Sequence, residues 1–236
     1  EMDYTPLHRW DVSCAEAERL QRALRERLVL QPPPDFAPRL AAGGDVSTHR
    51  DASRAYAGFV VLDIVSRETV DAVAVRAEVT FPYVPGLLSF REIPALAVAW
   101  QQLPTRPDFL VIDGHGLAHP RRMGIACHAG LVFNLPTIGC AKSLLVGRYG
   151  HLGEERGATA PLVHRGEVVG MAVRTRARVS PVYVSPGHCM DLPTAVELVL
   201  RLADYREPET TRRAHRLVNA LRRADLAGAP PPPHPE

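Results

Sequence analysis

The chain has 236 residues, of which 46% are hydrophobic and 23% are charged, the proportions of an ordinary globular protein. Its net charge of +2 neither requires nor excludes a nucleic-acid partner, because such a partner needs local clusters of positive charge. The four cysteines form no Cys-x-x-Cys pair, which argues against a cysteine-built zinc site. No signal peptide or apolar run of ~18 residues is apparent, so we expect a cytoplasmic protein without a membrane partner.

The N-terminal third predicts a helix followed by an antiparallel meander. Ser13 and Glu16 form a capping box ahead of apolar residues at helical spacing, so we expect a helix at 13–30 that decorates the main fold. Three prolines at 32–34 then make a stiff connector. Runs rich in apolar and β-branched residues predict three strands, the last two joined by a hairpin, at 40–47, 55–65 and 70–81.

Helices and strands alternate after a proline- and glycine-containing break at 82–86. A helix is predicted at 87–102, where Pro94 should bend it or lie near its start. The run 109–113 is apolar up to its final aspartate, which favours a parallel strand buried on both faces. The remaining predicted elements are helix 125–133, strand 137–141, hairpin 162–174, strand 179–184, and helices 191–203 and 209–225.

This order of elements predicts an α/β fold. Three antiparallel strands followed by strands with helical crossovers are typical of a ribonuclease H-like mixed sheet flanked by helices, here with extra C-terminal strands and helices. We expect one domain over residues 1–228 and a disordered, proline-rich tail at 229–236.

Two acidic residues end predicted strands, and a third lies in the helix between them. Asp45 and Asp113 would project from one edge if their strands are neighbours, and the repulsion between them would favour a shared cation. Glu92 would complete the site. Hard divalent ions such as Mg²⁺ take oxygen ligands, and such ions suit phosphoryl chemistry. The alternative, that each acid caps a turn, stays open.

Lys142 is the only lysine among the 28 basic residues, and it follows strand 137–141. An ammonium group fits close to a phosphate or a metal-bound water, whereas a guanidinium is a flat fork. Two glycines around His115 allow a ligand to approach the backbone closely. Both His115 and His119 are therefore candidates for orienting water or contacting phosphate, although packing roles for the histidines and chance retention of the lysine remain alternatives.

Other motifs exclude some enzyme classes and suggest a nucleic-acid contact. Neither the Gly-x-x-x-x-Gly-Lys-Ser/Thr phosphate loop nor the His-Glu-x-x-His zinc motif occurs, which excludes those kinases, ATPases and metalloproteases. Tyr83 lies between Pro82 and Pro85, which stiffen its loop. A rigid aromatic loop could act as a wedge between stacked bases, or it could simply pack on the core.

Three stretches together resemble the endonuclease V family, the deoxyinosine 3′ endonucleases: 81–92, 113–121 and 136–143. The likeness covers most of the chain, roughly from Gly43 to His215. It implies a ribonuclease H-like fold and a need for Mg²⁺, with Mn²⁺ as a substitute. It also implies recognition of flipped hypoxanthine in DNA, and often of inosine in RNA. The second phosphodiester bond 3′ to the lesion would be cut, leaving a 3′-hydroxyl and a 5′-phosphate.

The resemblance also assigns roles by position. Asp45, Glu92 and Asp113 correspond to metal-binding carboxylates, and His119 and Lys142 correspond to positions near the scissile phosphate. The strand-separating wedge corresponds to Pro82, Tyr83, Val84 and Pro85. The base pocket corresponds to Gly86, Leu88, Gly114, Gly124 and Ile125.

Two positions depart from the family pattern. His215 stands where some members carry aspartate, so it is a further candidate metal ligand that brings one negative charge fewer. Cys140 stands where valine is expected. Two rivals remain: a nuclease for RNA–DNA hybrids, which would not need the wedge, and a non-catalytic binding module, which would not need the acids and Lys142. No obligate protein partner is inferred.

Overall fold

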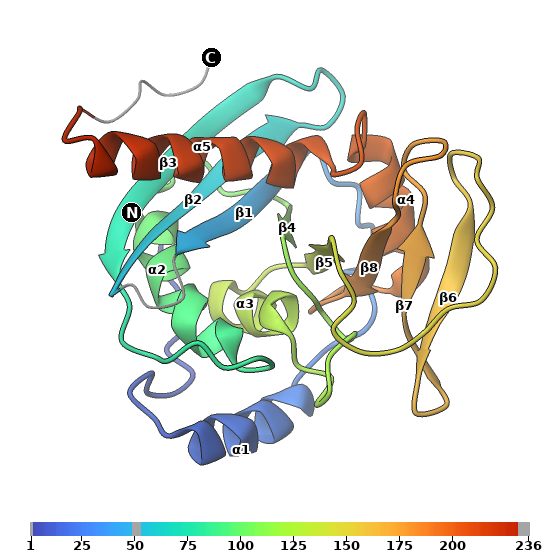
Figure 1. The fold of residues 1–236 in the computed structure, drawn as a ribbon, viewed down its shortest axis with the longest axis horizontal. Coiled ribbons are helices and arrows are strands. Elements are labelled where there is room, and N and C mark those ends of the chain that lie inside the picture. The colour runs from blue at the N-terminus through green and yellow to red at the C-terminus, as the bar shows by residue number, and fades with distance from the viewer. Residues whose placement is uncertain (1, 49–52, 231–236) are drawn as a thin grey trace.

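The computed structural model describes residues 2–48 and 53–230, which form a mixed sheet with helices on both faces (Figure 1). The strands are β1 (Leu40–Thr48), β2 (Arg54–Asp63), β3 (Thr69–Glu78), β4 (Phe109–Ile112), β5 (Thr137–Ala141), β6 (Thr159–His164), β7 (Glu167–Val173) and β8 (Val182–Pro186). The helices are α1 (Cys14–Arg25), α2 (Leu88–Gln102), α3 (Ile125–Phe133), α4 (Leu192–Leu202) and α5 (Glu209–Leu226). In the described residues the sheet has eight strands in the order β3-β2-β1-β4-β5-β8-β7-β6.

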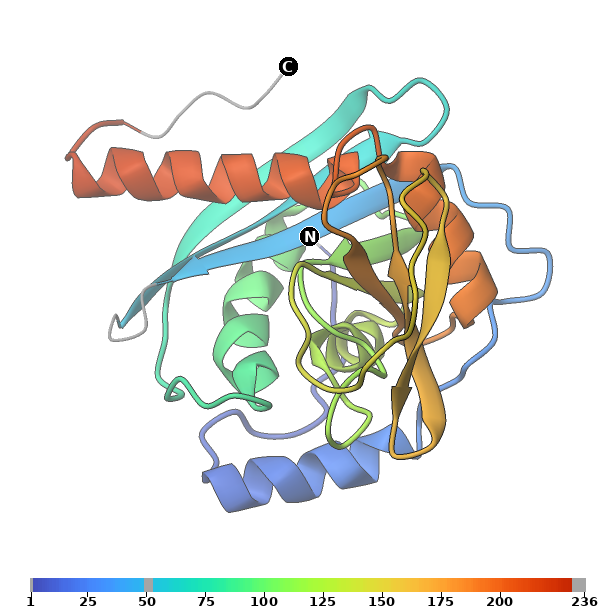
Figure 2. The ribbon, with the colours of Figure 1, turned by 45° about the vertical axis from the view of Figure 1, so that its right-hand side comes forward.

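The first three strands form the predicted antiparallel meander. β1 pairs with β2 from Leu40 to Thr48, and β2 pairs with β3 around the turn at 64–68. β3 keeps the alternation read from the sequence, because Val73 and Val75 are buried against α2 and α3. Its other face is covered by α5, which runs across β1 to β3 on the side opposite α2 (Figure 2).

β4 and β5 continue the sheet in parallel with β1. β4 pairs with β1 on one side and β5 on the other, and all four of its residues are buried. This confirms that the apolar run at 109–112 is a strand covered on both faces. As a result, the carboxyl ends of β1 and β4 meet at one edge of the sheet.

Close approach of a helix explains one glycine of β1. A Cβ on Gly43 would lie 2.1 Å from the backbone carbonyl of Thr210, far inside van der Waals contact. Only glycine therefore lets the first turn of α5 rest directly on the strand. This contact fixes where α5 begins, and it carries His215 to the strand end that holds Asp45.

Several element boundaries differ from the sequence prediction. β2 and β3 end at Asp63 and Glu78 rather than at 65 and 81. α1 ends at Arg25 rather than near residue 30, because Leu28 leaves the helix to pack on Met123, Cys127 and Leu131. β6 begins at Thr159 rather than 162, with Ala160 and Leu162 turned inward. β8 spans Val182–Pro186 rather than 179–184, since it pairs with β5 in that register.

Pro94 lies inside α2, six residues after its first residue Leu88. Of the predicted tail at 229–236, residues 231–236 lie outside the described part of the chain. Within that part, every helix is too short or too polar to cross a lipid bilayer.

Candidate functional site

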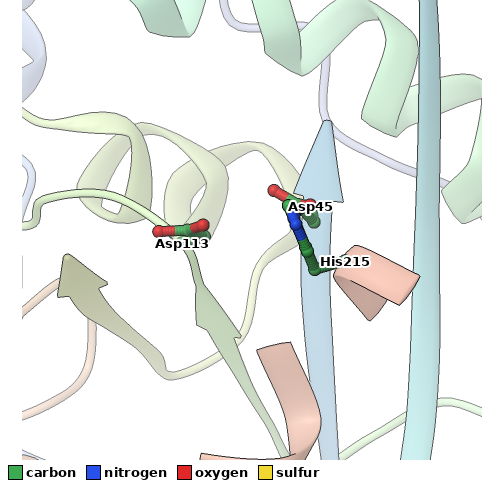
Figure 3. Close-up of side chains that lie close together, drawn as sticks. All are labelled: Asp45, Asp113 and His215. Atoms are coloured by element: carbon green, nitrogen blue, oxygen red, sulfur yellow. Dashed lines mark hydrogen bonds and ion pairs between the residues drawn. The ribbon is translucent and has the colours of Figure 1, made fainter. Parts of the chain in front are cut away.

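The site is built on two adjacent parallel strand ends. Gly44 of β1 pairs with Ile112 of β4. The residues that follow them, Asp45 and Asp113, therefore lie beside each other at the edge of the sheet. Asp45 is buried and Asp113 is half-buried. The expected neighbourhood of these strands is confirmed. Ligand atoms of Asp45, Asp113 and His215 all lie within 4.8 Å of one another, a spacing that could hold one metal ion (Figure 3).

His215 reaches this group from the exposed side of α5. Its Nδ1 donates a hydrogen bond to Oδ2 of Asp45 over 2.8 Å, and this bond raises the pKa of His215 although partial burial opposes the rise. Asn219 supports the ring from the next turn, with its Nδ2 3.1 Å from Nε2 of His215. The oxygen of the Asn219 amide in turn accepts from Ser47 over 2.9 Å. His215 therefore orients Asp45 in this conformation.

Glu92 stands in the second turn of α2 and is half-buried. Burial raises its pKa to about 8, and the negative charges of Asp45 and Asp113 add to the rise. The carboxyl group of Glu92 is thus close enough to both aspartates for their charges to affect its pKa. It is not a member of the mutually close trio found among the described residues. Negative charges on neighbouring carboxyl groups repel one another, and a divalent cation bound between them relieves this repulsion.

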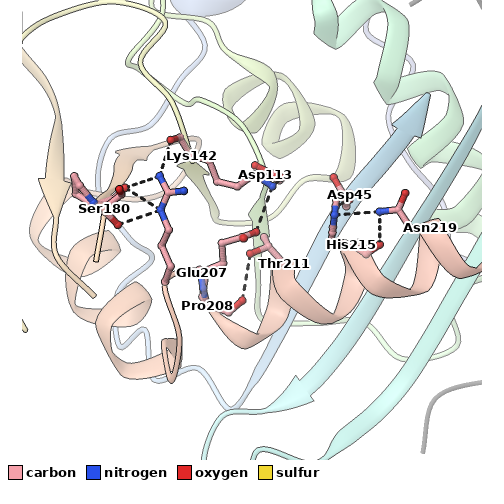
Figure 4. A network of polar contacts seen from close by, with 11 residues as sticks. Asp45, Asp113, Lys142, Ser180, Glu207, Pro208, Thr211, His215 and Asn219 are labelled. Carbon is pink, nitrogen blue, oxygen red and sulfur yellow. Dashed lines mark hydrogen bonds and ion pairs between the residues drawn. The ribbon is translucent and has the colours of Figure 1, made fainter. Parts of the chain in front are cut away.

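Lys142 begins the loop after β5 and faces the same strand edge. Its Nζ donates to Asp113 over 2.5 Å and to Glu207 over 3.3 Å (Figure 4). Burial alone would lower the pKa of Lys142, but attraction to the two carboxylates outweighs it and raises the pKa. Burial raises the pKa of Asp113 in spite of the ammonium. The lysine thus binds the acid cluster to Glu207, which the sequence reading missed because no motif marks it.

A cavity of about 320 Å³ adjoins the acids. Predicted site residues in its lining are Tyr83, Pro85, Gly86, Leu88, Glu92, Asp113, Gly114, His119, Gly124, Ile125 and Lys142. Pro82 and Val84 are not in the lining; Pro82 is exposed, and Val84 packs near Phe81 and Phe90. His115, the other candidate histidine, also lines the cavity. The lining residues that the sequence did not single out are Gln21, Ser89, Met123, Ala141, Ser143, Leu144 and Leu145. Asp113 belongs to both the cavity and the trio, so the two are contiguous.

The loop that carries Tyr83 is held by one carbonyl group. The carbonyl oxygen of Gly86 accepts from Gln21 over 2.9 Å, from Nε2 of His119 over 2.8 Å and from Arg121 over 3.0 Å. Gly86 has φ of +83°, a conformation that other residues rarely adopt. Because Gln21 lies on α1, the helix expected to be decoration takes part in holding this loop.

The two candidate histidines differ in their surroundings. Nδ1 of His119 accepts from the backbone N–H of Arg121 over 3.1 Å, so both ring nitrogens have backbone partners. Burial lowers the pKa of His119 to about 4, which keeps the ring neutral. Burial likewise lowers the pKa of His115 to about 4, but its buried Nδ1 has no hydrogen-bond partner among residues 2–48 and 53–230. His119 therefore supports the Gly86 loop, while His115 retains a free polar atom in a residue that lines the cavity.

The mixed α/β sheet, with carboxylates at the ends of adjacent parallel strands, has the ribonuclease H-like fold class expected from the sequence, and comparison with known proteins identifies the family. Residues 22–216 match the family model described as Endonuclease V. Endonuclease V of Myxococcus xanthus is 64% identical over 218 residues, covering 92% of this chain and 93% of the relative. The chain belongs to the endonuclease V family, and the predicted family and fold class are confirmed.

Solved structures of the family are similar along nearly the whole chain. The crystal structure of endonuclease V from Streptomyces avermitilis has a TM-score of 0.86 and 43% identity, covering 93% of this chain and 96% of that one. Ciona intestinalis endonuclease V, in complex with a 24mer DNA containing an inosine followed by a ribo-adenosine, has a TM-score of 0.76 and 27% identity, covering 91% and 98%.

Proposed function

We propose that this chain is a metal-dependent endonuclease that recognises hypoxanthine in DNA, and inosine in RNA, and hydrolyses the second phosphodiester bond 3′ to the lesion. The products would be a 3′-hydroxyl and a 5′-phosphate. The observation that carries the proposal is the contiguity of the acid cluster and the cavity through Asp113. Family membership and the inosine-containing complex of the Ciona relative support the choice of substrate.

The donor set fits a hard divalent cation. Asp45 and Asp113 offer carboxylate oxygens from adjacent strands. Glu92 adds a third carboxyl group, whose pKa is raised first by burial and then by the charges of the two aspartates. Mg²⁺, with Mn²⁺ as its substitute, would be held by these residues, with His215 beside Asp45. When bound, such an ion lowers the pKa of a coordinated water and neutralises charge that develops on the phosphate.

The side chains around the acids would handle charge during hydrolysis. In the overall reaction water adds to phosphorus, the P–O3′ bond breaks, and O3′ leaves with a proton. Lys142 keeps its ammonium beside Asp113, since its pKa is raised, and would stabilise negative charge on the phosphate oxygens. Glu207 and Asp113 hold that ammonium from two sides. His115 would supply a polar contact within the cavity.

The base would enter the cavity after leaving the helix stack. Extraction of hypoxanthine requires less energy than extraction of a well-paired base. Tyr83 is 39% exposed on a loop stiffened by Pro82 and Pro85, and it would fill the space left in the duplex. Gly86, Leu88, Gly114, Gly124 and Ile125 would surround the extracted base.

The decisive experiment maps the cut on end-labelled oligonucleotides. The protein is incubated with a deoxyinosine duplex, the same sequence with adenosine, an inosine-containing RNA and a plain RNA–DNA hybrid, each with and without Mg²⁺. We expect cleavage at the second phosphodiester bond 3′ to the lesion. It should require Mg²⁺ and should occur only in the substrates that contain the lesion. Asp113→Ala should abolish cleavage and keep DNA affinity. Cleavage of the plain hybrid, or full activity of Asp113→Ala, would refute the proposal.

A further inference from the structure

One wall of the cavity is connected to the N-terminal segment by a chain of hydrogen bonds. Ser89 of α2 lines the cavity, and its Oγ lies 3.0 Å from Nδ1 of His128. Nε2 of His128 lies 2.8 Å from Nε2 of His8, and Nδ1 of His8 lies 2.7 Å from the carbonyl oxygen of Arg9. The chain therefore runs from a backbone carbonyl to a residue that lines the cavity.

The carbonyl at its end fixes the direction of every bond. A carbonyl oxygen only accepts, so Nδ1 of His8 must carry the proton. A neutral imidazole has one N–H, which leaves Nε2 of His8 as an acceptor and makes Nε2 of His128 the donor. Nδ1 of His128 must then accept, and the hydroxyl of Ser89 donates to it. Burial lowers the pKa of both rings, which keeps them neutral near pH 7.

Packing holds the rings in this arrangement. His128 is fully buried and stacks on Trp10, with ring centroids 5.3 Å apart. His8 contacts Phe90 and Trp10 at centroid distances of 5.2 Å and 4.5 Å. Because neither ring is free to turn, the direction of the chain is preserved up to Ser89. The proton of that hydroxyl is committed to His128, and only its oxygen lone pairs remain for a ligand.

We propose that Ser89 presents a fixed hydrogen-bond acceptor to the base in the cavity, and that His8 and His128 are positioning residues that set this polarity. The inference rests on the proposed function. Hypoxanthine carries an N–H at N1, whereas adenine, from which it arises by deamination, has a lone pair there. An acceptor in the pocket therefore favours the deaminated base, because adenine would leave two acceptors facing each other unpaired.

The test removes N1–H from the substrate and Oγ of Ser89 from the protein, separately and together. Cleavage of a deoxyinosine oligonucleotide is compared with that of 1-deaza-2′-deoxyinosine, in which C–H replaces N1–H. We expect the wild type to prefer deoxyinosine about tenfold in kcat/KM, and Ser89→Ala to lose this preference by slowing on deoxyinosine alone. Ser180→Ala, at an exposed serine, is the matched control.

The outcomes separate this inference from the function on which it rests. A wild type that does not cut the deoxyinosine oligonucleotide would refute the proposed function. A wild type that cuts it while Ser89→Ala keeps the preference, or slows equally on both substrates, would refute the acceptor role of Ser89 alone.

The preference for deoxyinosine over its 1-deaza analogue also tests the positioning role of His8 and His128. His8→Phe removes the acceptor that fixes the tautomer of His128, so the preference should fall about threefold or more. His8→Gln should restore it, because its amide oxygen can accept from Nε2 of His128. His151→Phe, at an exposed histidine outside the cavity lining, should keep the wild-type preference. An unchanged preference in His8→Phe would overturn the role of the N-terminal segment.

Discussion

Lys142 shows how a single side chain can combine two carboxylates into one cluster. Its ammonium contacts Asp113 and Glu207 from the end of β5, whereas the other 27 of the 28 basic residues are arginines. A compact ammonium can contact both acids and a neighbouring phosphate, while a planar guanidinium would place its charge differently. We therefore expect the role proposed for this residue to depend on the size of the cation as well as on its charge.

Replacement of Lys142 should affect chemistry more than binding. We expect Lys142→Ala to lower the single-turnover cleavage rate about 100-fold, because a preorganised charge beside the phosphate is lost. Lys142→Arg should restore less than a tenth of the lost rate on this argument. Quenched-flow cleavage gives the rate, and fluorescence anisotropy in Ca²⁺ gives the affinity. Full recovery by arginine would contradict the argument from size.

His215 should act on metal affinity through Asp45. His215→Ala removes the donor that holds the Asp45 carboxylate, so the affinity for Mn²⁺ should fall about 10- to 100-fold. Calorimetric titration measures this directly. Arg216→Gln, at the exposed next position, should leave the affinity unchanged. Equal Mn²⁺ affinities in His215→Ala and the wild type would exclude any part of this histidine in the metal site.

The acidic residues of the site could be predicted from the sequence more fully than the side chains that hydrogen-bond to the site. Asp45 and Asp113 could be predicted because acids at the ends of neighbouring strands share an edge whatever the details of packing. Glu207 and Gln21 could not, because they reach the site from distant segments and carry no local pattern. The tautomer and partners of His119 also depend on tertiary contacts, which no spacing encodes.

At the level of elements, the loop 81–87 links the cavity to the N-terminal helix. The carbonyl of Gly86 accepts hydrogen bonds from α1 and from the segment after β4, so two distant parts of the chain hold the loop. α1 itself follows from its capping box, with Ser13 accepting from the N–H of Glu16. Its contact with the loop makes α1 part of the machinery that presents Tyr83.

Removal of the aromatic ring should weaken lesion recognition more than chemistry. Tyr83→Ala should lower the affinity for a deoxyinosine duplex about tenfold, since stacking on a base contributes ~1–3 kcal/mol. Tyr83→Phe keeps the ring and should remain near the wild type. Anisotropy with lesion and plain duplexes measures the preference, and single-turnover rates at saturating enzyme measure the chemistry. Unchanged lesion preference in Tyr83→Ala would exclude the wedge.

Across the whole molecule, buried neutral histidines link stability to pH. Burial holds the pKa of His128 well below 6.5, so the unfolded chain binds a proton that the folded chain does not. The contribution of His128 is therefore intact above pH 6.5 and is lost as the pH falls below that value. The raised pKa of Glu92 acts in the opposite direction between about 8 and 4.5, so a comparison with a variant is required.

Comparison of the wild type with His128→Phe isolates the contribution of the His128 side chain to the pH dependence of stability. Relative to His128→Phe, the wild type should lose unfolding free energy by about 1.4 kcal/mol per pH unit below pH 6.5. Urea unfolding at pH 7, 6 and 5 provides the values, and the pH slope separates the effect of ionisation from any constant effect of packing. Parallel slopes for the two proteins would show that His128 takes up a proton in the folded state.

Much of the sheet could be predicted, but not its full strand order. The meander, β4 and β5 were recognisable because strand burial leaves a local pattern of alternating or continuous apolar residues. The antiparallel pairing of β5 with β8 joins residues far apart in the chain, and short runs such as Val182–Pro186 do not reveal their partner. Helix ends such as that of α1 depend on which tertiary contact draws the chain away.

The solitary ε-amine gives the protein a built-in spectroscopic reporter. Protein produced with lysine labelled by ¹⁵N only at Nζ would contain one labelled nitrogen, positioned between Asp113 and Glu207. Its magnetic resonance signal would respond to ion loading and to arrival of the phosphodiester without interference from any second lysine.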